Sequence, residues 1–105
     1  MTVKPIELRI AARDDVDAAI DHYAGEAGED VAFGFIDALE RCYRAIEKHP
    51  GAGSPRYAEQ LGIGGLRHRA LRRFPYLVFY VERSDRIAVW RVLHARRDIP
   101  ASLRT

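Results

Sequence analysis

Three strand-like segments, separated by very short connections, constrain the fold of this chain more than any other feature of its sequence. They are Leu66–Leu71, Tyr76–Glu82 and Ile87–His94, joined by Arg72–Pro75 and Arg83–Arg86. Connections this short cannot carry a crossover, so consecutive segments must be antiparallel neighbours in one sheet. The middle segment is almost entirely apolar or aromatic, which predicts that it lies in the centre of that sheet.

A further strand and a helix are predicted near the N-terminus. Ile6, Leu8 and Ile10 alternate with polar or small residues, a spacing typical of a half-buried strand. Carboxylates follow at the expected start of the helix, where they would face unpaired backbone N–H groups. We therefore interpret them as helix-start charges and not as an acid–base pair. These carboxylates are Asp14, Asp15 and Asp17.

A second helix is predicted over Glu29–Lys48, because apolar residues recur there at helical spacing. Residues 49–65 are rich in Gly and Pro, which predicts a loop with one helical turn at Tyr57–Leu61. Asp98 is expected to cap a short final helix. The element order β-α-α-β-β-β predicts an α+β fold in which a helical hairpin packs on a mostly antiparallel four-stranded sheet. The length predicts a single domain over residues 1–105.

Charge is distributed unevenly between the two halves of the chain. Residues 1–50 carry 6 basic and 11 acidic residues, whereas residues 51–105 carry 11 basic and 4 acidic residues. This asymmetry favours an anionic partner for the second half. The sequence shows no apolar run long enough for a membrane span and no apolar core of a secretory signal. We therefore expect a soluble protein of the cytoplasm with no membrane partner.

The candidate binding residues are basic side chains on or near the predicted strands. They are Arg67, Arg69, Arg91, His94, Arg96 and Arg97. If the strands pair as proposed, many of these groups gather on one side of the sheet, among Tyr76, Tyr80 and Trp90. Arginines interleaved with aromatic rings suit phosphate, nucleobases or an acidic peptide. The alternative is a solvated sheet face on which arginine stems cover the aromatic rings.

Catalytic chemistry has fewer candidates. His94, close to Arg97, could act as a general acid–base in phosphodiester chemistry, although a histidine at a strand end is also commonly structural. His22, His49 and His68 do not form a metal-binding spacing, so no metal site and no cofactor are expected. Cys42 lies on the apolar stripe of the second helix and is expected to be a buried thiol.

Four segments in this order resemble the ParE branch of the RelE/ParE toxin superfamily. They are Ile46–Pro50, Gly65–Arg69, Phe74–Tyr80 and Arg91–Pro100, the last running Arg-Val-Leu-His-Ala-Arg-Arg-Asp-Ile-Pro. The resemblance implies a bacterial, cytoplasmic toxin of a type II toxin–antitoxin pair that inhibits DNA gyrase by binding and is not itself an enzyme. Its antitoxin would be a ParD-like protein whose toxin-binding part is acidic or amphipathic. The antitoxin would also bind DNA, so no sequence-specific DNA binding is expected of this chain alone.

The alternative within the superfamily is a RelE-like, ribosome-dependent mRNA endoribonuclease. His94 and Arg97 would then be its catalytic residues. Against this, His68, Ala70 and Leu77 stand where the mRNA-cleaving branch usually has Lys or Arg, and no Tyr follows Tyr80. An apolar side chain such as Leu77 cannot stabilise phosphate charge, so the departures favour the ParE interpretation. A third possibility is a superfamily member that binds its partner but no longer acts as a toxin.

Overall fold

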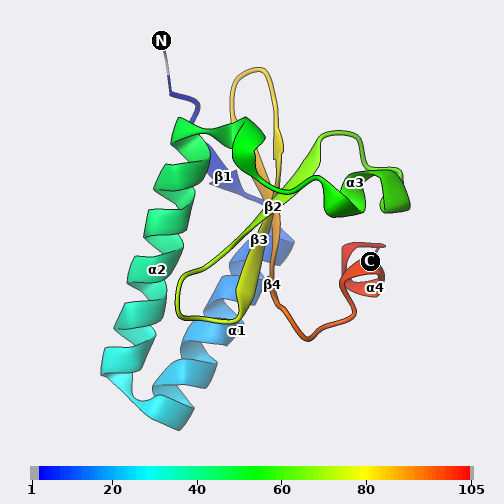
Figure 1. Cartoon of the computed structure of the whole chain (residues 1–105). Coiled ribbons are helices and arrows are strands. Elements are labelled where there is room, and N and C mark those ends of the chain that lie inside the picture. The colour runs from blue at the N-terminus through cyan, green and yellow to red at the C-terminus, as the bar shows by residue number, and fades with distance from the viewer. Residues whose placement is uncertain (1–2, 105) are drawn as a thin grey trace.

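The computed structural model describes residues 3–104. In chain order the strands are β1 (Ile6–Leu8), β2 (Leu66–Ala70), β3 (Tyr76–Glu82) and β4 (Ile87–His94). The helices are α1 (Ile10–Ala27), α2 (Glu29–Lys48), α3 (Arg56–Leu61) and α4 (Ile99–Arg104), and Pro50–Ala52 forms a short 3-10 turn, η1. The α+β fold and the order of its main elements are as predicted from the sequence (Figure 1).

The sheet has the strand order β1-β4-β3-β2, so β3 and β4 are central and β2 is an edge strand. β2 pairs with β3, and β3 with β4, in antiparallel register, whereas β1 lies parallel to β4. The short connections of the second half therefore produce the predicted antiparallel neighbours. After β1 the chain passes through the helical hairpin and re-enters the sheet at its opposite edge, as β2.

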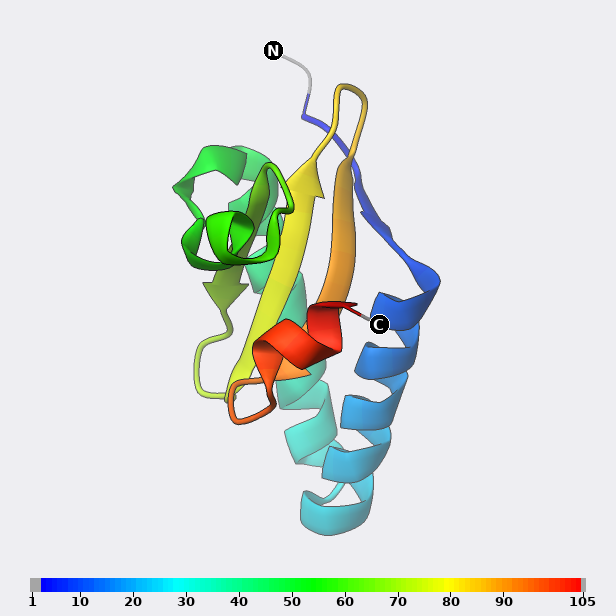
Figure 2. The same cartoon turned by 90° about the vertical axis from the view of Figure 1, so that its right-hand side faces the viewer.

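Helices cover both faces of the sheet, so the second face is not the open surface that the sequence suggested (Figures 1 and 2). α1 and α2 pack on one face, where Phe35 and Leu39 meet Val78 and Tyr80. On the opposite face, α3 and α4 cover a smaller cluster. This cluster includes Leu66, Phe79, Val81, Leu93, Ile99 and Leu103. The apolar positions of each strand alternate between the two clusters because side chains of a strand point to opposite faces in turn.

The start of α1 corrects two predictions. Ile10 is the first residue of α1 and is 79% exposed, so the apolar alternation that suggested a strand residue there was misleading. The carboxylates predicted to open the helix lie beyond its first turn, which contains no acidic residue. β1 ends early because the Arg9 N–H still donates to the Val89 carbonyl, whereas the Arg9 carbonyl already accepts the Arg13 N–H as the first helical bond.

Candidate functional site

Arg91 lies inside the molecule and not on an exposed basic face. Its Nε donates to Asp15 Oδ2 at 2.7 Å, and its Nη2 donates to Asp15 Oδ1 at 2.8 Å. Its Nη1 donates to the Ser102 carbonyl of α4 at 2.8 Å. The side chains of Arg91 and Asp15 are only 15% and 9% exposed. The hydrogen bonds to Asp15 raise the pKa of the guanidinium further, so Arg91 is a permanently charged link between α1, β4 and α4.

Asp15 has a second function that the sequence did not reveal. Beyond Val89 no strand of residues 3–104 pairs with the outer edge of β4, because β1 ends at Leu8. Asp15 Oδ2 accepts the Val92 N–H at 2.9 Å and so replaces the missing strand as a hydrogen-bond acceptor. The interpretation of Asp15 as a helix-start charge is therefore wrong. Its partners lie 76 and 77 residues away, a separation at which sequence spacing carries no signal.

Arg67 also makes an internal contact. Its Nη1 donates to the Gly53 carbonyl at 2.8 Å, and the Tyr80 hydroxyl donates to the Pro50 carbonyl at 2.6 Å. The backbone of Ser54 forms an isolated antiparallel bridge with His68. These contacts fix the segment between α2 and α3 against the sheet. Arg67 thus shares a face with Arg69 by strand alternation, but its guanidinium is already engaged.

His94 and Arg97 come together at the C-terminal end of β4. They line a pocket of about 140 Å³ with Tyr76, Val92 and residues of α1 that include Asp15. The His94 ring meets the Tyr76 ring edge to face at 5.2 Å, and His94 Nδ1 accepts the Arg96 N–H at 3.1 Å. Burial raises the pKa of Tyr76, whereas the charge of Arg97 lowers it. Arg96 and Arg97 are both exposed in the turn that follows β4.

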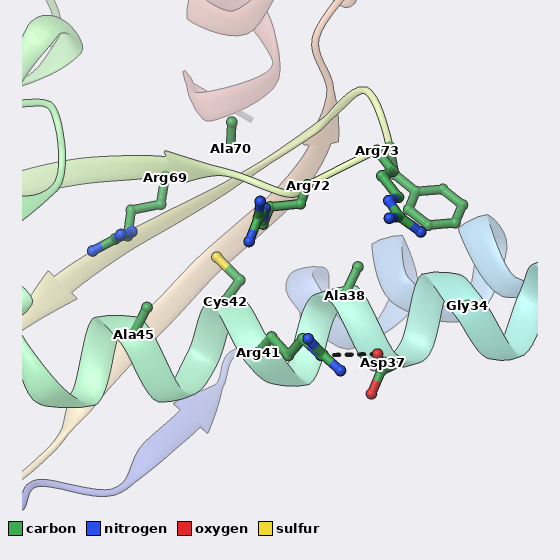
Figure 3. A pocket seen from close by; sticks show the side chains of 11 residues that line it. Gly34, Asp37, Ala38, Arg41, Cys42, Ala45, Arg69, Ala70, Arg72 and Arg73 are labelled. Carbon is green, nitrogen blue, oxygen red and sulfur yellow. Dashed lines mark ion pairs between the residues drawn. The ribbon is translucent and has the colours of Figure 1, made fainter.

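A larger groove separates α2 from the edge strand β2 and the β2–β3 turn (Figure 3). Its volume is about 540 Å³. The basic side chains that line it are Arg41, Arg69, Arg72 and Arg73. Of these, Arg69 was a candidate from the sequence, whereas Arg41 was not, because only the packing of α2 beside β2 brings the two together. We name this cavity the α2–β2 groove.

Cys42 lies at the bottom of the α2–β2 groove and is buried. Burial raises the pKa of its thiol to about 11, although the charge of Arg69 acts in the opposite direction. The thiol is therefore neutral at physiological pH and is a poor nucleophile there.

Residues 3–104 lack two further kinds of functional feature. No three His, Cys, Asp or Glu side chains of this range are grouped so that they could hold a metal ion. None of the helices in the same range is long and apolar enough to cross a membrane.

Comparisons with known proteins agree with the fold. A family model described as the ParE toxin of the type II toxin–antitoxin system parDE matches residues 6–99. A solved structure titled "Chromosomal ParDE TA system from P. aeruginosa" contains a chain that superposes with a TM-score of 0.74. The two chains are 21% identical, and the match covers 90% of this chain and 98% of that chain. At this identity the likeness concerns the fold alone. No curated protein sequence matches the chain.

Proposed function

The chain belongs to the ParE toxin family of type II toxin–antitoxin systems, and we propose that it inhibits DNA gyrase by binding to it in the cytoplasm. The single observation that supports this proposal is the match of the ParE family over residues 6–99. The Leu77 side chain is consistent with it, because Leu77 packs in the cluster under α3 and α4 and offers no charge to a phosphate. A ParD-like antitoxin is the partner that neutralises the toxin.

We place the gyrase-binding surface at the turn that follows β4. Arg96 and Arg97 are exposed there, next to the half-buried His94. Within residues 3–104 neither arginine forms an ion pair with a carboxylate, so both can meet an anionic group of a partner. Arg67 and Arg91, by contrast, support this surface from inside, since their guanidinium groups are engaged.

A supercoiling assay with purified DNA gyrase tests the proposal. The chain should inhibit supercoiling, and its antitoxin should reverse the inhibition. The double variant Arg96→Gln with Arg97→Gln should inhibit much less while keeping its circular dichroism spectrum. The matched control is Arg44→Gln with Arg83→Gln, which removes the same charge from other exposed positions. A folded chain that binds its antitoxin but leaves supercoiling unchanged would refute the gyrase target.

Ribosome-dependent mRNA cleavage is the second candidate, and the pocket shared by His94 and Arg97 favours it. His94 Nδ1 accepts a backbone hydrogen bond, which leaves Nε2 to carry the proton of the neutral ring. A histidine beside an unpaired arginine is suited to acid–base chemistry on a phosphodiester. This candidate requires cleaved mRNA soon after induction and a loss of toxicity in His94→Gln. Full toxicity of that variant would eliminate it.

A further inference from the structure

The α2–β2 groove carries positive charge that no carboxylate of the described part of the chain neutralises. Arg69, Arg72 and Arg73 form no ion pair there. The one carboxylate in the lining, Asp37, is engaged with Arg41 at 2.9 Å. Three unpaired guanidinium groups around one cavity therefore favour an anionic occupant, because each can form paired hydrogen bonds with a carboxylate or a phosphate.

The same chain carries a complementary acidic surface on α1. Four exposed residues follow one another there at steps of three or four positions, so they lie in one row along the helix. This row, which we name the α1 stripe, consists of Ile10, Asp14, Asp17 and Asp21. Within residues 3–104 none of its carboxylates forms an ion pair. Ile10 is 79% exposed, so the stripe also presents an apolar side chain at one end.

The α1 stripe and the α2–β2 groove match in length. The groove runs along α2 from Gly34 to Ala45, a length of about 16 Å at the usual rise of a helix. The stripe from Ile10 to Asp21 spans the same number of positions, so it is also about 16 Å long. Figure 3 shows the arginines of the groove spaced along α2, a row that a single phosphate is too short to span. A helix laid along the groove can bring several carboxylates to that row.

The wall of the groove permits a helix to approach closely. Ala38, Cys42 and Ala45 present small side chains to it, and Gly34 presents none. Two helices approach each other more closely when the side chains at their contact are small. Phe74 adds an apolar ring to the lining, on which an exposed apolar side chain can pack. The groove therefore suits a partner that is helical and acidic with an apolar end, as the α1 stripe is.

The two surfaces lie on different sides of the molecule, so one chain cannot bring its own stripe into its own groove. α1 lies beside β4, to which Asp15 connects it, whereas the groove adjoins β2 at the far edge of the sheet. Figure 2 shows α1, in blue, and β2 on opposite sides of the central strands. A contact between stripe and groove thus joins different surfaces of two copies. Such a heterologous contact leaves a free stripe and a free groove on every pair, so it extends beyond a dimer into a ring or an open chain.

We propose that a second copy of this chain docks its α1 stripe into the α2–β2 groove. The carboxylates of the stripe pair with the three unpaired arginines of the groove, and Ile10 packs on Phe74. This inference goes beyond the proposed function and does not depend on it, because it involves neither gyrase nor an antitoxin. It also gives the uneven charge of the sequence a physical role, since the acidic first half supplies the stripe and the basic second half supplies the unpaired arginines.

Sedimentation velocity of the purified chain tests the proposal. The mean sedimentation coefficient should rise with protein concentration at about 0.05 M salt, and it should fall towards the value of the monomer at about 0.5 M salt, where exposed charge pairs are screened. A chain that stays monomeric up to roughly 0.5 mM at the lower salt concentration would overturn the proposal.

Neutral variants of the groove locate one half of the contact. Arg69→Gln with Arg72→Gln should weaken self-association at least roughly tenfold. The matched control Arg44→Gln with Arg83→Gln removes the same charge from other exposed positions and should stay within about twofold of the unmodified chain. Association that the groove variant and the control weaken equally would reflect net charge alone and would overturn the proposal.

Neutral variants of α1 locate the other half. Asp14→Asn with Asp17→Asn should weaken self-association at least roughly tenfold, although the groove is unchanged. Glu26→Gln with Glu59→Gln is the matched control, because both glutamates are exposed and lie outside the stripe. Self-association that the stripe variant leaves intact would place the contact elsewhere, for example at Phe33, which is 65% exposed, and would overturn the proposal.

A charge swap provides the sharpest test. Arg69→Glu with Arg72→Glu makes the groove acidic, and Asp14→Lys with Asp17→Lys makes the stripe basic. Each variant alone should remain monomeric, because its stripe and its groove then carry charge of the same sign. An equimolar mixture of the two should associate again, since each reversed surface meets its complement on the other variant. A mixture that stays monomeric while circular dichroism shows both variants folded would overturn the proposal, and if either variant does not fold, the neutral variants decide.

Discussion

Removal of the Asp15 carboxylate is expected to destabilise the protein more than removal of any surface charge. Asp15 accepts two hydrogen bonds from Arg91 and one from the Val92 N–H, and its side chain is 9% exposed. In Asp15→Ala the Arg91 guanidinium is left largely buried, with only the Ser102 carbonyl as a hydrogen-bond partner. The Val92 N–H loses its acceptor, and no strand of residues 3–104 covers this part of the edge of β4.

The magnitude follows from these losses. Leaving one charge of a buried ion pair without its partner costs about 3 kcal/mol at the lower end of the usual range. An unsatisfied backbone N–H adds about 1 kcal/mol. The expected decrease in the free energy of unfolding is therefore about 4 kcal/mol, a large share of the roughly 5 to 15 kcal/mol typical of a domain this size. Asp15→Asn keeps an acceptor oxygen for the Val92 N–H but removes the charge that pairs with Arg91, so it should cost about 3 kcal/mol.

Urea denaturation measures this effect directly. Trp90 is the only tryptophan of the sequence and precedes Arg91, so its fluorescence reports on the region, with circular dichroism as a second probe. With a slope of about 1.5 kcal/mol per molar urea, the midpoint should fall by between about 2 and 3 M. In a double-mutant cycle, Arg91→Met should recover part of the loss, because it removes the unpaired charge.

A matched exposed pair provides the control. Lys4 Nζ lies 2.9 Å from Glu82 Oε2, but the two side chains are 33% and 43% exposed. Glu82→Ala should therefore cost less than about 1 kcal/mol. If Asp15→Ala costs no more than Glu82→Ala, the reasoning from burial and hydrogen bonding is refuted. The result also determines how Arg91 variants are interpreted, because Arg91→Ala breaks the same ion pair. If that variant is unfolded, its loss of toxicity says nothing about target binding.

Three further changes have defined outcomes. Gly53→Ala should lower the free energy of unfolding by between about 1 and 3 kcal/mol, because the added Cβ would clash with the Tyr80 hydroxyl. An unchanged midpoint in urea denaturation would contradict this. Tyr43→Phe should leave the free energy of unfolding unchanged or raise it by up to about 1 kcal/mol in urea denaturation. The reason is that the buried Tyr43 hydroxyl has no hydrogen-bond partner in residues 3–104. A clear loss of stability would contradict this. Burial, together with the charge of Arg56, lowers the pKa of His68 below its ordinary value of 6.5. The contribution of neutral His68 to the free energy of unfolding is therefore fully present above pH 6.5. It is lost as the pH falls through the lowered pKa of His68 in the folded protein. Melting temperatures measured across this window should fall less steeply in His68→Gln, and parallel curves would argue against the assignment.

The secondary structure was largely predictable because helical spacing and strand alternation are both patterns among residues close in the sequence. The strands of the second half follow from apolar composition and short connections, and α2 follows from its apolar stripe. The assignment of Ile10 to the first strand failed because it relied on the same local patterns. The apolar alternation continues by chance past Leu8, although α1 begins at Ile10. No local pattern can show that β1 is too short to cover β4, and the position of Asp15 depends on that fact.

The candidate site was predictable only as a set of charges. Arg67 and Arg69 alternate correctly on β2, yet one bonds to a loop carbonyl and the other lines a groove whose opposite wall is a helix. Arg91 differs from both because its guanidinium bonds to Asp15 of α1, and it pairs with Phe79 next to a bulge between β3 and β4. Partners of this kind are fixed by tertiary packing, which sequence spacing does not encode.

The excess of basic residues in the second half therefore does not form one binding face. Arg67 and Arg91 hold internal hydrogen bonds, which an external partner could use only by breaking them. Of the other arginines, Arg69, Arg72 and Arg73 line the α2–β2 groove, whereas Arg96 and Arg97 are exposed in the turn after β4. Because these two groups of arginines lie on different elements, Arg96→Gln with Arg97→Gln tests the turn after β4 without altering the α2–β2 groove.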